Sequence, residues 1–290
     1  MEPIKNRYEF VMLFDVENGN PNGDPDAGNM PRTDPETSFG IVTDVCLKRK
    51  IRNYVQLVPA DEKADNKNNI LVLPDKALNT RFTEAYEALG LPLKQKGKNT
   101  DDVKAARDYM CRNYFDVRAF GAVMSTGDDP CGIVRGPVQI TFGKSVDPIF
   151  PQDITITRQA RTTEDRKATG ETEMGKKSIV PYGLYRAEGY ISALLAQNVT
   201  GFDENDLELL WTAIENMFEI DRSAARGKMT MRKLVVFKHP TALGNAPSSQ
   251  LFDKVKVEKK EGVTVPRSYS DYTVSVDGSD VNGVEVIEKL

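Results

Sequence analysis

The chain has 290 residues, a formal net charge of −4 at pH 7, 39% hydrophobic residues and three cysteines. This composition is typical of a folded protein and excludes disorder as the main state, and the length allows one elaborated domain or two smaller ones. No apolar run approaches the roughly 18 residues of a membrane span and no signal-peptide pattern precedes the first strand, so we expect a cytoplasmic protein without membrane contact.

The residues that most often carry enzyme chemistry are few. Cys46, Cys111 and Cys131 are far apart and form no CxxC pair, so we interpret them as buried thiols rather than zinc ligands. The only histidine, His239, follows an apolar run and precedes a proline, which is typical of a structural residue at a strand end. With one histidine and no GxSxG motif, the sequence predicts no catalytic residues, no metal site and no cofactor.

The first predicted elements are a strand and a helix. Residues 7–16 form an apolar run of strand length, and a turn-rich segment follows it to about residue 35. Thr43 is expected to cap a helix whose apolar residues recur at helical spacing up to Val58. Its basic residues are expected to form an outer face: Lys48, Arg49, Lys50 and Arg52.

The middle of the chain combines an insertion, two strand patterns and a charged arm. Residues 60–114 contain polar stretches and two short helical patterns, which indicates a helical insertion. Strand patterns return at residues 133–142 and 182–191. The highly charged segment between them, residues 150–180, is expected to be an extended β-hairpin arm.

The last part of the chain completes the fold pattern. Asp203 is expected to cap an amphipathic helix, and residues 232–237 form a strand pattern. Strand-like fragments after residue 241 predict a further hairpin. Without the insertions, the order is strand, helix, strand, strand, helix, strand. We therefore predict an α+β fold, ferredoxin-like or RNA-recognition-motif-like, with two helices over one face of an antiparallel sheet.

The charge is unevenly distributed along the chain. Residues 1–40 carry 3 basic and 8 acidic groups, residues 41–58 carry 4 and 1, and residues 221–240 carry 6 and 1. The loop around Gly227 contains small residues beside Arg and Lys, which suits phosphate contacts that do not read bases. Most basic runs are only solvated faces, so charge alone leaves RNA binding and nonspecific surface charge open. The aromatic signature for base stacking on an open sheet is absent.

Several separated segments together resemble one protein family. They are Asp15–Asp24, Ile41–Arg52, Phe115–Ala122, Arg135–Gln139 and Arg222–Lys228. In this order they resemble the backbone subunit of type I CRISPR Cascade complexes, a CRISPR RNA-binding protein of the RAMP superfamily, and most of all its type I-C version.

This resemblance implies a hand-shaped protein. Its RNA-recognition-motif-like palm would comprise residues 1–59, 115–149 and 181–290, with a helical finger insertion at 60–114 and a thumb β-hairpin at 150–180. Copies would stack head to tail along a CRISPR RNA, grip its phosphates and leave bases free to pair with a target DNA strand in antiviral defence. The other implied partners are the 5′-handle-binding, large and small subunits of Cascade, and the subunit itself would be non-catalytic.

The resemblance also implies which residues touch RNA. From the palm these are Asn20, Asn22, Lys48, Arg49 and Arg52, and from the loop after the second palm helix Arg222, Arg226 and Lys228. From the thumb they are Arg158, Gln159, Arg161, Lys176 and Lys177. Met174 is the candidate apolar wedge at a kink in the RNA.

A metal-dependent, RNA-cleaving backbone subunit is the alternative, as in related type III complexes. Asp24 and Asp26 lie in the loop after the first strand, and carboxylates can hold Mg²⁺. The same Asn-Gly-Asp-Pro-Asp pattern is also ordinary turn chemistry, which we favour. A standalone RNA-binding module is a third interpretation.

Overall fold

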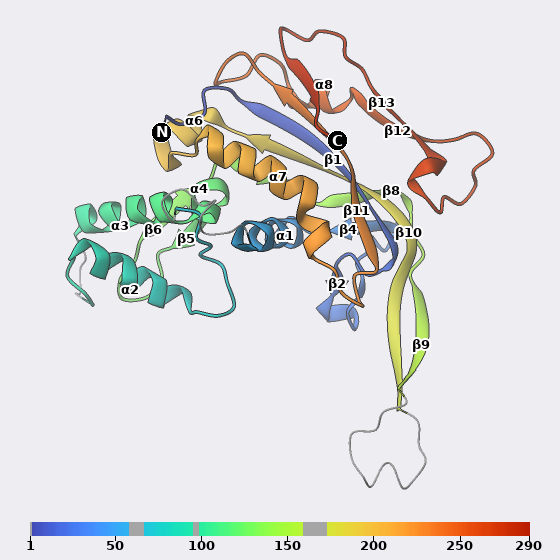
Figure 1. The fold of residues 1–290 in the computed structure, drawn as a ribbon, viewed down its shortest axis with the longest axis horizontal. Helices are drawn as coiled ribbons and strands as arrows, with labels where there is room; N and C mark the ends of the chain where they lie inside the picture. The colour runs from blue at the N-terminus through green and yellow to red at the C-terminus, as the bar shows by residue number, and fades with distance from the viewer. Residues whose placement is uncertain (1, 58–66, 95–98, 159–172) are drawn as a thin grey trace, which may run out of the picture.

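A computed structural model describes residues 2–57, 67–94, 99–158 and 173–290. Its centre is an antiparallel sheet in the strand order β14-β11-β1-β10-β8-β4, with β7 and β9 also paired to β10 (Figure 1). The strands are β1 (Tyr8–Gly19), β4 (Phe39–Val42), β7 (Val138–Ile140), β8 (Gly143–Pro148), β9 (Gln152–Arg158), β10 (Glu173–Ile191), β11 (Lys228–Lys238) and β14 (Glu285–Glu288). The expected mixed fold on an antiparallel sheet is confirmed.

Smaller sheets and the helices surround this centre. The short strands are β2 (Gly23–Asp24), β3 (Met30–Pro31), β5 (Gly121–Met124), β6 (Gly132–Arg135), β12 (Val255–Lys259) and β13 (Tyr272–Val276). The helices are α1 (Asp44–Leu57), α2 (Leu78–Leu89), α3 (Thr100–Asn113), α4 (Phe115–Phe120), α6 (Ala193–Leu195), α7 (Glu204–Ile220) and α8 (Ser248–Phe252), and short helical turns are η1 (Pro25–Ala27), η3 (Ala196–Thr200) and η4 (Tyr269–Asp271). Among the described residues, no helix has the length and apolar character needed to cross a bilayer.

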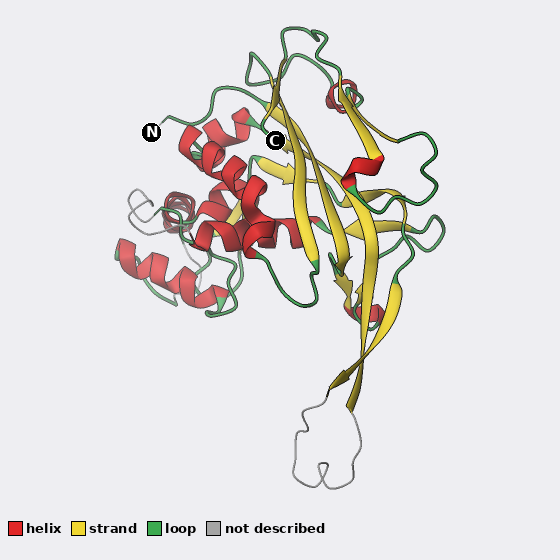
Figure 2. Cartoon of the chain, turned by 45° about the vertical axis from the view of Figure 1, so that its right-hand side comes forward, coloured by secondary structure: helices red, strands yellow, loops and turns green. Residues whose placement is uncertain are grey.

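The central strand β1 is buried on both faces. Because side chains alternate along a strand, Phe10, Met12 and Phe14 pack into the core beneath α1 and α7. Val11 and Leu13 point the other way, into a second core formed with the C-terminal segment. Figure 2 shows the longer helices gathered on one side of the sheet, away from the C-terminal hairpin. The apolar run in the sequence therefore reflects a strand between two layers.

The C-terminal segment closes the second face of the sheet. The predicted hairpin is confirmed, because β12 and β13 pair from Val255↔Val276 to Lys259↔Tyr272. Leu251 and Phe252 of α8 are buried beside Tyr272 in the same core. The sequence did not predict α8, nor that β14 would extend the sheet beside β11. This face is therefore covered rather than open.

The first predicted helix is present, but its basic outer face is not. Thr43 caps it as expected, with Oγ1 accepting a hydrogen bond from the Cys46 N–H at 3.3 Å. Lys50 and Arg52, predicted on the outer side, are instead buried. Each has a carboxylate partner from a distant part of the chain, described below, which a periodicity argument cannot reveal.

The strand predicted at 133–142 is broken into β6 and β7. Gly136 separates them and lies so close to α4 that an added Cβ would be 2.2 Å from the Phe120 carbonyl carbon. The next residue is Pro137, which cannot donate to a strand ladder. Consequently β6 pairs with β5 beside the finger helices, whereas β7 pairs with β10 in the main sheet.

The expected β-hairpin arm is present as far as the structure describes it. β9 pairs antiparallel with the first part of β10, from Gln152↔Ile179 to Arg158↔Glu173. β10 continues without a break into the main sheet, where it pairs with β1. In Figure 1 the β9–β10 ribbon projects away from the body. We call this ribbon the thumb arm; residues 159–172 lie outside the described part.

The finger has its own core and is anchored to the palm by buried ions. Its core contains Phe82, Tyr86 and Met110 from α2 and α3, and extends past residue 114 to residues of the β5–β6 hairpin. Arg118 on α4 forms two hydrogen bonds of 2.7 Å with the Asp206 carboxylate at the start of α7. Both side chains are almost completely buried, and Arg118 Nη1 also donates to the Lys67 and Cys111 carbonyls of the finger at 3.1 and 2.9 Å, so Arg118 fixes the finger against α7.

Candidate nucleic-acid interface

Two loops that are distant in sequence are joined backbone to backbone at the end of β1. The Asn20 N–H donates to the Ala225 carbonyl at 2.8 Å. Arg226 Nη1 donates back to the carbonyls of Asn20 and Pro21 at 3.2 and 3.0 Å. Gly227 has a φ of 63°, and a Cβ there would be 2.4 Å from the Asn18 carbonyl oxygen. The loop after β1 and the α7–β11 loop (residues 221–227) thus form one rigid unit, which we call the loop clamp.

An ion pair between buried Lys50 and half-buried Asp221 ties the loop clamp to α1. The Asp221 carboxylate contacts Lys50 Nζ, and Arg226 Nε lies 3.5 Å from the same Asp221 oxygen. Lys50 is only 1% exposed and its ammonium lies 5.7 Å from the centre of the Phe218 ring. Asp221 was not among the predicted site residues, although a single acidic residue at the start of a basic strip was a usable signal.

The two predicted asparagines shape the loop after β1. Asn22 Oδ1 accepts hydrogen bonds from the N–H and the hydroxyl of Thr43, both at 2.9 Å, and so links the loop to the start of α1. Asn20 Nδ2 donates to the Asn29 carbonyl at 2.7 Å, whereas its Oδ1 is buried and has no partner among the described residues. Both asparagines therefore lie in the loop clamp, as neighbours of its cations.

The predicted cations of α1 all have partners inside the protein. Lys48 Nζ bonds the Asp44 carboxylate at 2.9 Å, and Arg49 Nη1 donates to the Val72 carbonyl at 2.8 Å. Arg52 Nε donates to the buried Asp116 carboxylate at 2.8 Å. Asp116 also accepts the backbone N–H groups of residues 71 and 72. Arg52 therefore joins α1 to the start of the finger.

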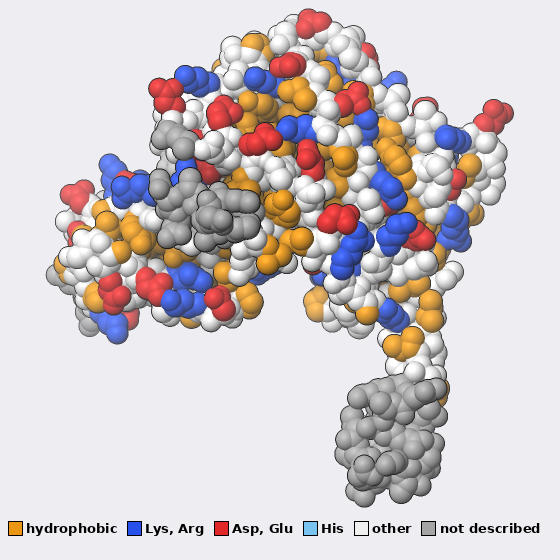
Figure 3. All heavy atoms as spheres, viewed as in Figure 1, with side chains coloured by type: hydrophobic (Ala, Val, Ile, Leu, Met, Phe, Trp, Pro, Cys, Tyr) orange, Lys and Arg blue, Asp and Glu red, His pale blue; other side chains and the backbone are white. Residues whose placement is uncertain are grey.

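The cations at the outer edge of the loop clamp are more exposed. Arg222 pairs with Glu219 of the preceding helix, and the Arg222 side chain is 46% exposed. Lys228 Nζ lies 3.2 Å from Glu17, with 61% of the Lys228 side chain exposed. Exposed ion pairs are worth little, about 0–1 kcal/mol, so an anionic ligand can compete for these cations. Figure 3 shows Lys and Arg side chains gathered over the lower ends of β10 and β11, above the thumb arm.

The described thumb residues lie on two different faces of the arm. Register places Met174 and Lys176 opposite Thr157 and Thr155, so these side chains share one face. Lys177 lies on the other face, where the arm exposes Ile154 and Ile156. Met174 is 76% exposed, as an apolar wedge requires. Arg158 ends β9, and Gln159 and Arg161 lie outside the described residues.

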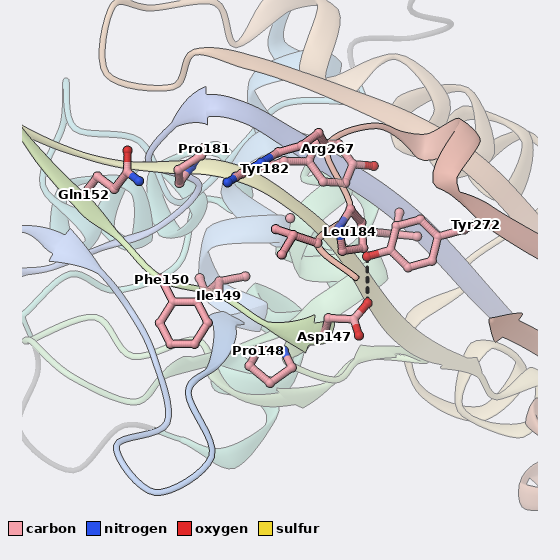
Figure 4. A pocket seen from close by; sticks show the side chains of 13 residues that line it. Asp147, Pro148, Ile149, Phe150, Gln152, Pro181, Tyr182, Leu184, Arg267 and Tyr272 are labelled. Carbon is pink, nitrogen blue, oxygen red and sulfur yellow. Dashed lines mark hydrogen bonds between the residues drawn. The ribbon is translucent and has the colours of Figure 1, made fainter. Parts of the chain in front are cut away.

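A small cavity lies where the thumb arm joins the palm (Figure 4). It has a volume of about 80 Å³ and is lined by Pro148, Ile149, Tyr182 and Tyr272, among others. Tyr272 donates a hydrogen bond to the Asp147 carboxylate at 2.8 Å across one wall.

Asp24 and His239 have structural partners, whereas Asp26 contributes its backbone N–H to the turn. Asp24 Oδ1 accepts the Asp26 N–H at 3.1 Å, which caps the short turn η1, and it lies 3.4 Å from Arg32. Within the described ranges, no three His, Cys, Asp or Glu side chains are grouped as metal ligands. The structural role predicted for His239 is confirmed, because it is fully buried, with Nε2 2.5 Å from Glu9 and Nδ1 accepting the Asn245 N–H.

The predicted thiols are only partly confirmed. Cys111 and Cys131 are buried in the core shared by the finger and the β5–β6 hairpin, and burial raises the pKa of Cys111 to about 11 and that of Cys131 to about 12. Cys46 is half-buried beside the loop clamp, with its thiol 3.6 Å from the Pro21 carbonyl. Burial also raises the Cys46 pKa, so all three thiols are protonated near neutral pH.

Known proteins resemble this chain in sequence and in fold. A CRISPR-associated protein Cas7 from Haloferax volcanii is 27% identical over 233 residues, which is 73% of this chain and 65% of that protein. The chain therefore spans about two thirds of the length of this relative. A chain of a CRISPR RNA-guided surveillance complex, described as pre-nicking, matches with a TM-score of 0.51, 14% identity and coverage of 80% of this chain and 75% of the other.

A chain of a type III-B Cmr-beta complex bound to cognate target RNA matches with a TM-score of 0.43 and 10% identity, covering 80% of this chain and 61% of the other. The decisive comparison is with the family model for the CRISPR-associated protein Cas7, which matches residues 6–277. This match includes the finger, the thumb arm, the loop clamp and every strand of the central sheet except β14. The chain therefore belongs to the family of the CRISPR-associated protein Cas7.

Proposed function

We propose that this protein is the non-catalytic CRISPR RNA-binding backbone subunit of a type I-C Cascade complex. Copies polymerise head to tail along the guide, hold its phosphates and leave its bases free to pair with target DNA, forming an R-loop. Membership of the Cas7 family supports the backbone role. The type I-C assignment rests on the motifs named in the sequence analysis.

The observation that carries the proposal is the loop clamp with its exposed cations. It is a rigid, small-residue surface edged by Arg222 and Lys228, which suits contacts to phosphates of any sequence. Many weak contacts of this kind, repeated by successive copies on one RNA, give a tight assembly.

We further propose that the palm is RNA-recognition-motif-like but binds RNA at its edge. The strand order β11-β1-β10-β8, with α1 and α7 on one face, is the order of a ferredoxin-like domain. The face that such domains often use for base stacking is covered here by the C-terminal segment. RNA is therefore directed to the loop clamp and the thumb arm instead.

The proposed partners follow from this role. They are the CRISPR RNA, neighbouring copies of this chain, the target DNA strand, and the 5′-handle-binding, large and small subunits of Cascade. We place the complex in the cytoplasm, where guide and target are processed. Specificity in this scheme comes from base pairing, and the protein supplies only the grip.

A matched pair of charge reversals tests RNA binding. Arg222→Glu with Lys228→Glu should prevent several copies from loading onto one CRISPR RNA, as measured by native mass spectrometry after co-expression. The control is Lys256→Glu with Lys260→Glu, which makes the same change in net charge at exposed sites on and beside β12. Normal loading by the first variant would contradict the proposal, as would equal loss in the control.

Lys48 and Arg52 are also implied RNA contacts, but charge reversal at these two residues is a poorer test of RNA binding. Arg52 is paired with buried Asp116, so Arg52→Glu would place two carboxylates together inside the protein. Breaking a buried pair costs about 3–5 kcal/mol, and the fold itself would be at risk. Loss of assembly would then have two explanations.

The non-catalytic part of the proposal has its own experiment. The assembled complex is incubated with complementary RNA and Mg²⁺, and we expect no cleavage because Asp24 serves as a turn cap and ion-pair partner. Regularly spaced cuts that disappear in Asp24→Ala would overturn this and favour the RNA-cleaving alternative.

A further inference from the structure

We propose that Asp221 is a positioning residue for RNA binding, although its charge repels RNA. Its carboxylate orients the Arg226 guanidinium within the loop clamp, so that Nη2 is the group that meets an RNA phosphate. This inference rests on the proposed function and explains how Arg226 is oriented before RNA binds.

Two of the three nitrogens of the Arg226 guanidinium, Nε and Nη1, have partners inside the protein. The guanidinium has five N–H donors, one on Nε and two on each terminal nitrogen. Nε lies 3.5 Å from the Asp221 carboxylate as an ion pair, and Nη1 donates hydrogen bonds to two carbonyl oxygens of the loop after β1. No contact of Nη2 is found in the described part of the chain. Since the Arg226 side chain is 32% exposed, Nη2 can reach a ligand while the other donors hold the plane fixed.

Asp221 itself is held by the protein interior. Its carboxylate also contacts Lys50 Nζ, and Lys50 is anchored on α1 beneath the clamp. A buried ammonium needs a counter-charge, so Asp221 cannot turn away without leaving Lys50 unpaired. Arg226 is therefore oriented from the palm helix through Asp221, and not only by its own loop.

Positioning and simple electrostatics predict opposite signs. If only total charge matters, removing the Asp221 carboxylate makes the site more positive and RNA binds more tightly. If Asp221 positions Arg226, the same change frees the guanidinium to sample other rotamers, and RNA binds more weakly because ordering it costs entropy.

The experiment compares two variants that lack the buried cation. Asp221→Asn alone would leave Lys50 charged and unpaired inside the protein, so we place it in a Lys50→Met background, where Met replaces the Lys stem above Phe218. The references are wild type, which has the same net charge as K50M/D221N, and Lys50→Met with Asp221 intact, in which Asp221 has lost its anchor. The affinity of all three proteins for a mixed-sequence single-stranded RNA is measured by fluorescence anisotropy over a series of salt concentrations, with thermal unfolding midpoints recorded in parallel.

We expect K50M/D221N to bind RNA roughly tenfold more weakly than wild type, with a log–log salt slope lower by about 1, as for the loss of one phosphate contact, and K50M to bind no more tightly than wild type. Glu219→Gln is the control, since it removes an exposed carboxylate beside Arg222 and should leave binding equal or tighter. Equal or tighter binding by K50M/D221N would overturn the positioning role. If the wild-type protein binds no RNA, the proposed function itself fails, which is a separate result.

Discussion

At the residue scale, the structure separates cations that look alike in sequence. Lys50 and Arg52 are adjacent to Lys48 and Arg49, yet the first two are buried against carboxylates and hold elements together. Arg222 and Lys228 form only exposed pairs at the edge of the loop clamp. The distinction depends on acidic partners 64 and 171 residues away, so local patterns could not show it.

Asp15 gives a prediction about pH. Burial raises the pKa of Asp15, although Arg232 and the Tyr182 hydroxyl, both hydrogen-bonded to it, act in the opposite direction. A raised pKa in the folded state stabilises the protein below the unfolded value, and this stabilisation is lost as pH rises through the folded pKa. Urea unfolding from pH 3 to 7 should therefore show the stability of wild type relative to Asp15→Asn falling as pH increases.

Asp271 supplies the opposite sign for comparison. Backbone N–H groups of Arg267 and Ser268 lower its pKa, so its stabilisation is present at higher pH and is lost as pH falls. Relative to Asp271→Asn, wild type should gain stability as pH rises over the acidic range. The assignment for Asp15 would be contradicted if the stability difference between wild type and Asp15→Asn did not change with pH. It would also be contradicted if that difference rose with pH, as expected for Asp271.

At the element scale, several segments extend or divide beyond their sequence patterns. β10 joins a thumb pattern and a palm pattern into one strand of 19 residues, whereas the pattern at 133–142 is divided at Gly136. The α7–β11 loop matched its predicted place, but its shape depends on close backbone contact with the loop after β1. Local sequence patterns thus determine whether a segment forms a helix or a strand, whereas contacts with neighbouring segments determine where that element ends.

Gly227 tests this backbone contact. Both Gly227 and Gly28 have positive φ values, 63° and 59°, but only Gly227 has a neighbouring atom where a Cβ would be. Gly28→Ala should cost about 1 kcal/mol of unfolding free energy for the left-handed backbone alone. Gly227→Ala should cost roughly 1–3 kcal/mol more, because the two loops must separate.

Chemical denaturation of the two alanine variants measures the difference directly. RNA affinity should follow the same order, with Gly227→Ala weakened and Gly28→Ala close to wild type. Similar losses of stability in both variants would mean that the contact between the loops is not tight.

At the scale of the whole molecule, the body and the thumb arm differ in how they are held. The finger is fixed to the palm by Arg118 and Asp206, and the C-terminal segment shares a core with the sheet. The thumb arm, in contrast, pairs through β9 with β10 alone, and its side chains at residues 153–157 and 174–176 are exposed. Its strands therefore contribute little to the core.

Removing the thumb arm should leave the body folded. Asp153 and Ser178 are cross-strand partners, so residues 154–177 can be replaced by a two-residue Asn-Gly turn that suits a β-hairpin. Thermal unfolding followed by circular dichroism should give a midpoint close to that of wild type. Under the proposed function, the same variant should no longer assemble in several copies on a CRISPR RNA. Failure to fold would show that the arm supports the palm.

The sequence by itself determined the type and order of the main elements, the caps at Thr43 and Asp203, and the paired tail hairpin, because these follow from local spacing and turn chemistry. It also located the loop around Gly227. Only the tertiary structure decided that the sheet is covered on both faces and which cations are buried. Those outcomes depend on contacts between segments far apart in the chain, where burial, and not residue type, determines whether a charge is available to a ligand.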